Sequence, residues 1–282
     1  MTAGRRGTAG WPRIGFGRAG PGKDWHRDTP PAPLLALALL LTGCGSDAAP
    51  AKTPEGVPGQ GAAGPQSDAA SVLRASPAPT PTPSPAEIPD LGPQTRAAIP
   101  AEARQAFVVT GEGADSHQSS AVLYSREDPA QGWQPVAGPW PAHNGMEGWT
   151  DHHVAGDLRS PKGVYSLTDA GGRLPDPGAL LPYDEHPRFA VDGEGFYGEP
   201  LEGSFDYVIA INYNRIEGVT PLDRDRPLGL ERGGGIWIHV DHGGPTQGCV
   251  SIPEELMEEL LRTLDPAMSP VIVMGDGETL GR

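Results

Sequence analysis

From about residue 98 onward, the sequence is divided into short runs of β-branched and aromatic residues. Gly, Pro, Asn and Asp separate these runs, which is the pattern of strands joined by tight turns. The sequence therefore predicts a mainly β domain over residues 98–282. Strands are expected at 105–111, 119–127, 132–140, 142–149, 163–168, 188–192, 205–214, 235–240 and 270–275.

A single helix is expected at residues 253–265, which read PEELMEELLRTLD. Pro253 suits the first helical position, and the two glutamates after it suit the positive end of the helix dipole. Leucines recur at every fourth position, as they do on a buried helix face. The helix is therefore expected to pack against the sheet.

The N-terminus has the features of an export signal. The apolar run at 34–41 is too short to cross a bilayer, which takes about 20 residues, and six basic side chains precede it. This order is typical of a secretory signal peptide. The run ends in L-T-G-C, which resembles the lipobox of bacterial lipoproteins and implies a signal peptide over 1–44 with a lipid on Cys44. A plain signal peptide with a coincidental cysteine is the alternative.

Residues 45–97 are predicted to be a disordered linker rich in Pro and Ala. The stretch ASPAPTPTPSPAEIP (75–89) favours extended polyproline geometry and cannot build a core. Such a spacer suits a domain that works at a distance from its anchor. We therefore expect an exported protein, held at the cell membrane by its lipid and facing the cell wall.

The chain is acidic, with a formal net charge of −15. Residues 1–43 hold 6 of its 21 basic and 2 of its 36 acidic side chains, so the remainder carries 15 and 34, a charge of −19. A body of this charge repels nucleic acid and anionic lipid. No nucleic-acid partner is expected, and a membrane contact is expected only through acyl chains.

Two cysteines occur in the chain, Cys44 and Cys249. If Cys44 is acylated, Cys249 has no disulfide partner in an oxidising compartment. A thiol kept under those conditions is a buried structural cysteine, a metal ligand or a nucleophile.

The segment IWIHVDHGGPTQGCVSI (236–252) surrounds this second cysteine. Along the expected strand the aliphatic residues face the core, whereas Trp237 and His239 face the other way. The Gly-Gly-Pro turn then reverses the chain and brings Cys249 back towards His239. An imidazole in that place would generate the reactive thiolate.

Other residues of this segment have expected roles in acyl transfer. The amides of Gly248 and Cys249 would point at a developing oxyanion, and the missing Cβ of Gly248 would let the substrate approach. Thr246 would hydrogen-bond the histidine and fix its tautomer. The substrate groove is expected to be lined by Trp237, His242 and Gly244.

The run T-Q-G-C-V-S and its upstream histidine resemble the active-site motif of the YkuD-type L,D-transpeptidases, in which a histidine is followed after a spacer by Ser/Thr-His-Gly-Cys. GDLRSPKGVYSL (156–167) is similar to another segment of that family, and FDYVIAINYN (205–214) fits one of its strands. The likeness extends over most of residues 105–275. Gln247 stands where the motif has its second histidine, and the spacer is shorter than usual.

The resemblance implies a β-sandwich or mixed sheet with one helix after the catalytic cysteine. It also implies Cys249 as nucleophile and His239 as base. Together they would form a thioester with a peptidoglycan stem peptide, release D-Ala and complete a 3→3 cross-link without a cofactor. Two alternatives use the same domain: an L,D-carboxypeptidase, in which water resolves the thioester, and a wall-binding lipoprotein without catalysis.

Two further interpretations of the segment remain open. His242 lies seven residues before Cys249 and could be the base in place of His239. The run H-V-D-H (239–242) also offers two imidazoles and a carboxylate. Because His242 would point away from the other two on a strand, no metal site is expected.

Overall fold

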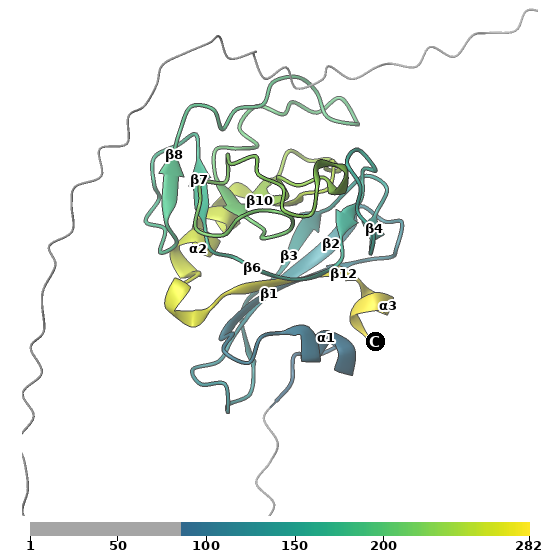
Figure 1. The fold of residues 1–282 in the computed structure, drawn as a ribbon, viewed down its shortest axis with the longest axis vertical. Coiled ribbons are helices and arrows are strands. Elements are labelled where there is room, and N and C mark those ends of the chain that lie inside the picture. Colours follow the sequence, from purple (N-terminus) through teal and green to yellow (C-terminus); the bar gives the residue numbers. More distant parts are fainter. Residues whose placement is uncertain (1–85) are drawn as a thin grey trace, which may run out of the picture. The chain divides into compact units, whose positions relative to one another are not determined.

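The computed structural model describes residues 86–282, and these residues contain a ten-stranded mixed sheet and a separate two-stranded one (Figure 1). The large sheet has the order β6-β12-β1-β2-β3-β11-β10-β9-β7-β8. Its strands are β1 (Gln105–Gly111), β2 (Gln118–Ser125), β3 (Gln134–His143), β6 (Gly163–Ser166), β7 (Ala170–Gly172), β8 (Tyr183–Glu185), β9 (Val208–Ala210), β10 (Trp237–Val240), β11 (Val250–Ile252) and β12 (Val271–Asp276). The small sheet pairs β4 (Trp149–Thr150) with β5 (Ser160–Pro161).

The mainly β class is confirmed, and ten of the twelve strands within residues 86–282 belong to one mixed sheet. Four of the strand predictions were wrong in detail. The strand expected at 205–214 is limited to β9, Val208–Ala210. Two strands were expected over residues 132–149, but a single long strand, β3, extends to His143. The register of β3 against β2 shifts at a β-bulge, so the strand continues through this region and no turn interrupts it. Residues 188–192 form no strand; they lie in a loop in which Phe189 is buried.

The strand direction around the cysteine also differs from the expectation. β11 pairs with β10 in parallel, so the loop between them carries the chain back to the start of β10 before β11 begins. A reversal at the Gly-Gly-Pro turn would have given an antiparallel pair. The parallel arrangement decides which residues of the two strands stand side by side.

The predicted helix is present as α2 (Glu254–Thr263), and its buried residues pack in the main core. Two short helices were not expected: α1 (Pro93–Ala98) and α3 (Gly277–Leu280). Figure 1 shows them together at one end of the sheet, where the Gly92 amide donates to the Leu280 carbonyl at 2.8 Å. The predicted domain boundary at residue 98 therefore lies too late, because Ile88 and Leu91 are already buried.

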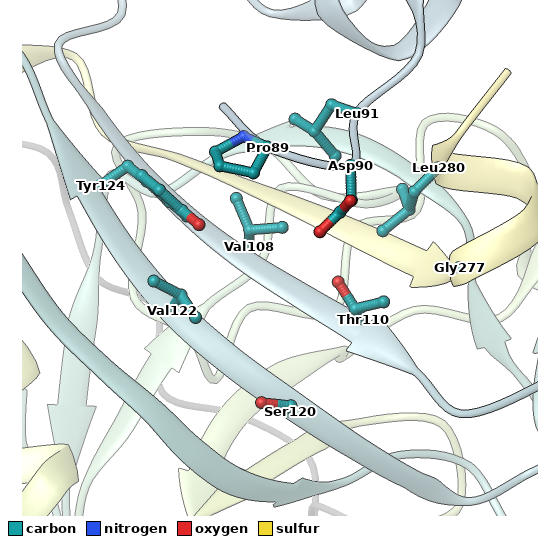
Figure 2. A pocket seen from close by; sticks show the side chains of 10 residues that line it. All are labelled: Pro89, Asp90, Leu91, Val108, Thr110, Ser120, Val122, Tyr124, Gly277 and Leu280. Carbon is teal, nitrogen blue, oxygen red and sulfur yellow. The ribbon is translucent and has the colours of Figure 1, made fainter. Parts of the chain in front are cut away.

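The sheet has an apolar core on one face, and a smaller cluster lies on the other. Phe107, Leu123 and Ile238 belong to the first. The second forms around Ile88, Val108 and Leu280, and beside it is a cavity of about 240 Å³. Figure 2 shows the Asp90 carboxylate and the Thr110 hydroxyl facing each other across this cavity, above the strands β1 and β2.

The remaining N-terminal predictions lie outside the described residues. These are the signal peptide, the lipid attachment at Cys44 and the linker as far as residue 85. Among residues 86–282, none of the helices has the length and apolar character needed to cross a membrane.

Candidate active site

The parallel pair β10–β11 places Cys249 and His239 on one face of the sheet. The register pairs His239 with Ser251, so Cys249, two residues earlier, lies level with Trp237. Side chains alternate along a strand, which turns both residues to the face opposite the main core. Their Cβ atoms should be on the order of 8 Å apart, since neighbouring strands are about 4.8 Å apart and two residues advance about 6.6 Å. At that separation a thiol and an imidazole can approach each other.

The Cys249 sulfur is held by the backbone at the start of β10. The amide of Trp237 donates to Sγ at 3.4 Å, and the thiol donates to the Gly235 carbonyl at 3.7 Å. Cys249 has no disulfide partner among the described residues and is partly exposed. Desolvation by the surrounding protein raises the pKa of the thiol to about 11, although the Trp237 amide opposes this by lowering it.

His239 is buried and fixed in one tautomer. Its Nδ1 lies 2.8 Å from the Val240 carbonyl, which can only accept, so Nδ1 carries the proton. Burial lowers the pKa of His239 to about 4, which outweighs the opposite effect of the Val240 hydrogen bond. At neutral pH the ring is therefore uncharged, and its Nε2 has a lone pair available to accept a proton.

The two pKa shifts together define the resting state of the site. With the thiol pKa near 11 and the His239 pKa near 4, Cys249 is protonated and His239 is neutral at pH 7. The site is thus not a preformed thiolate–imidazolium pair. Proton transfer has to accompany attack on a substrate, which is general-base catalysis.

We expect alkylation of Cys249 by iodoacetamide to be slow at pH 7 and to rise about tenfold per pH unit until the pH approaches about 11. The reason is that only the thiolate reacts. The measurement is the alkylation rate of the peptide containing Cys249, followed by mass spectrometry. The same chain unfolded in guanidinium is the control and should level off near the ordinary thiol pKa of about 8.5. A plateau in the folded protein at or below neutral pH would contradict the resting state described above.

The turn before Cys249 is closed by its own side chain, which corrects two predictions. The Thr246 hydroxyl donates to the Cys249 carbonyl at 2.7 Å and accepts the Gly248 amide at 3.1 Å. Thr246 therefore holds the turn and does not bond the histidine, whose Nδ1 is bonded to Val240. The Gly248 amide, expected to point at an oxyanion, is occupied by Thr246, as is common where Ser or Thr side chains cap a turn.

Glycine is required at position 248 for the backbone. Its φ of 143° lies in a region that favours glycine. A Cβ at this position would come within 3.0 Å of the Arg159 carbonyl. The absence of a Cβ at Gly248 therefore makes room for the backbone of Arg159. It was expected to make room for the substrate.

The segment 156–167 reaches this turn through Ser160. Its hydroxyl lies 2.8 Å from the Gly248 carbonyl and 3.3 Å from the Cys249 carbonyl, and it accepts the Gly145 amide at 2.9 Å. Ser160 is fully buried. Two of the three sequence segments on which the family resemblance rests therefore meet at the cysteine.

Trp237 lies beside the cysteine in an aromatic wall. Its ring packs between Phe189, at 5.7 Å between ring centroids, and Phe205, at 5.0 Å. Phe205 also meets the His239 ring edge-on at 5.4 Å. The indole Nε1 is buried and has no hydrogen-bond partner within the described part of the chain. These contacts are compatible with the predicted substrate-binding role of Trp237.

His242 and Gly244 are covered by a loop that carries Glu199. Nδ1 of His242 lies 3.2 Å from Glu199 Oε1, and both side chains are largely buried. A Cβ on the buried Gly244 would collide with the same carboxylate. Both residues, expected to line the substrate groove, therefore contact Glu199 in this structure.

The two candidate bases lie next to each other. The ring of His242 stacks on that of His239 at 5.8 Å with an angle of 10°, so it does not point away as expected. Cys249 is level with Trp237, and His239 follows two residues later on the same strand. His239 is therefore closer along the sheet to the sulfur than His242, which favours His239 as the base.

Asp241, His143 and Ser251 form a hydrogen-bonded network that the sequence pattern does not predict. Asp241 Oδ1 lies 2.8 Å from His143 Nδ1 and accepts the Ser251 hydroxyl at 2.6 Å. These hydrogen bonds hold the pKa of Asp241 near 2 in spite of its burial. Ser251 could have been found from its two-residue spacing to Cys249. His143 could not, because it lies 98 residues from Asp241 in the chain.

Within residues 86–282, no group of three or more His, Cys, Asp or Glu side chains is arranged to hold a metal ion. The side chains of H-V-D-H are used differently: His239 bonds the backbone, His242 meets Glu199, and Asp241 bonds His143.

No protein-family model, curated protein or solved structure matches this chain. The function of this protein is therefore inferred from its sequence motifs and from the geometry of the site.

Proposed function

We propose that this protein is an acyltransferase of the L,D-transpeptidase type, acting on peptidoglycan stem peptides through Cys249. The observation that carries the proposal is a partly exposed thiol on the same sheet face as a neutral imidazole whose Nδ1 is fixed. A nucleophile, a base and a group that orients the base are the parts that cysteine acyl transfer requires. The L,D-transpeptidase fold itself is part of this proposal.

The proposed reaction has two halves. His239 Nε2 takes the thiol proton as Sγ attacks the carbonyl between an L-centred diamino acid and the terminal D-Ala. D-Ala leaves as an amine, and the acyl group stays on Cys249 as a thioester. An amine of a neighbouring stem then attacks the thioester, which gives the 3→3 cross-link and restores the thiol. No cofactor is needed in either half.

The proposed setting is the cell wall. An export signal at 1–44 and acylation at Cys44 would tether the domain to the outer face of the membrane, and residues 45–85 would span the distance to the substrate. Without residues 1–43 the chain would carry a formal charge of −19, which anionic lipid repels, so the lipid on Cys44 would have to supply the tether.

The test is incubation of the protein with a tetrapeptide stem that ends in a diamino acid and D-Ala. We expect release of D-Ala and a 3→3 linked dimer, measured by mass spectrometry. Release of D-Ala with only the shortened tripeptide would instead indicate an L,D-carboxypeptidase. A folded protein that binds the stem but releases no D-Ala and forms no adduct would contradict the proposal and indicate a wall-binding module.

A further inference from the structure

We propose that His143, held by Asp241, is a second catalytic imidazole that donates a proton to the leaving amine. This inference rests on the function proposed above and deepens it. His239 would take the thiol proton, and His143 would supply the proton that D-Ala needs in order to leave.

Strand pairing puts the two imidazoles on either side of the cysteine strand. Ser251 pairs with His143 of β3 on one side and with His239 of β10 on the other. Paired residues share a sheet face, so the two histidines and Ser251 form one row on the face to which Cys249 also points. Cys249 is two residues before Ser251, and each imidazole is therefore its diagonal neighbour, with Cβ atoms about 8 Å from that of Cys249.

Both rings are anchored in the same way. Nδ1 of His239 is bonded to Val240, and Nδ1 of His143 is bonded to Asp241. The two acceptors, Val240 and Asp241, come after His239 in the chain. Cys249 instead lies level with Trp237, which comes before His239. The side-chain hydrogen bonds that these two rings make within residues 86–282 both use Nδ1. Nε2 is therefore the ring nitrogen that would exchange a proton in the proposed reaction.

The surroundings of the two rings differ in charge. His143 is partly exposed and faces the Asp241 carboxylate, with Glu199 contributing a second negative charge and the His117 ring stacked on it at 6.1 Å. The hydrogen bond to Asp241 raises the pKa of His143. His239, buried among Phe205 and His242, is held neutral. Environments that separate two pKa values in this way assign one group as acid and the other as base.

The protons balance over the two halves of the reaction. In the first, the thiol proton passes to His239 Nε2 and the His143 Nε2 proton passes to the departing amine as the C–N bond breaks and the C–S bond forms. In the second, the entering amine gives one proton back to His143 as the C–N bond forms. The C–S bond breaks, and protonated His239 returns its proton to sulfur. Both rings end as they began.

The test compares two acyl donors that differ in the leaving group. A D-Ala amide must be protonated to leave, whereas a p-nitrophenyl ester of the same acyl group releases a stable anion. We expect His143→Asn, whose amide can still donate to Asp241, to slow acylation by the amide about 100-fold. Acylation by the ester should change by less than about threefold. His152→Asn replaces an exposed imidazole elsewhere and is the matched control.

The pH profile of the unaltered protein gives a second readout that does not depend on a variant folding. With the amide, acylation should fall above the raised pKa of His143, and with the ester this fall should be absent. Equal slowing of both donors in His143→Asn, or the same alkaline fall with both, would overturn the role of His143. If the unaltered protein is acylated by neither donor, the proposed function fails first and this inference fails with it.

Discussion

Replacement of Cys249 by Ala is expected to abolish covalent acylation completely. A carbapenem resembles the acylating group of the proposed substrate, so incubation should add its full mass to the unaltered protein and none to Cys249→Ala. The reason is that the thiol supplies the bond-forming electron pair, and no other described side chain of the site offers an equivalent nucleophile at Sγ. Intact-mass spectrometry, followed by peptide mapping of the adduct to Cys249, is the measurement.

The fold should survive this substitution. The Cys249 sulfur makes two weak hydrogen bonds, to Trp237 and Gly235. Its loss should change the free energy of unfolding by no more than about 1 kcal/mol, measured by denaturant titration. Cys249→Ser is the matched control, because it keeps a hydroxyl in place of the thiol. A carbapenem adduct on Cys249→Ala would show that another residue reacts, and would refute the assignment of the nucleophile.

The sheet was predictable where its strands are long and apolar. The segments that became β1, β10 and β12 carry β-branched runs and were predicted close to their observed bounds. Short strands such as β7, with the sequence AGG, have no such pattern, because their pairing is decided by neighbours far away in the chain. The buried segment around Ile88 was missed for a related reason: its proline-rich context resembles a linker, and tertiary packing overrides that tendency.

The site was predictable only in its local part. His239 and Cys249 lie within one segment, so strand alternation and the turn between them were enough to predict that they come close together. The parallel direction of β11 was not predicted, since a turn sequence does not show where the returning chain pairs. His143 comes from β3, and only the completed sheet brings it opposite Ser251. Long-range pairing of this kind leaves no trace in the spacing of residues.

His239→Asn is expected to slow acylation of Cys249 about 1000-fold, because it removes the acceptor for the thiol proton. The Asn amide can still donate to the Val240 carbonyl, so the local backbone should be kept. The measurement is the rate of adduct formation with a carbapenem at pH 7. His242→Asn is the matched control for the neighbouring stacked ring. A larger loss in His242→Asn than in His239→Asn would mean that the base has been assigned to the wrong histidine.

Acid titration of stability separates a lost base from a lost fold in the same variant. The pKa of His239 is about 4 in the folded protein and about 6.5 in the unfolded chain, so the unfolded state binds the extra proton first as the pH falls. The contribution of neutral His239 to the free energy of unfolding is fully present above pH 6.5. This contribution is lost as the pH falls from 6.5 to 4. Over that window the free energy of unfolding should drop by about 3 kcal/mol more in the unaltered protein than in His239→Asn. His143 and Asp241 titrate in both proteins and largely cancel in the difference. If the two proteins lose stability in parallel, His239 is not held neutral by burial, and the argument for Nε2 as a neutral proton acceptor fails.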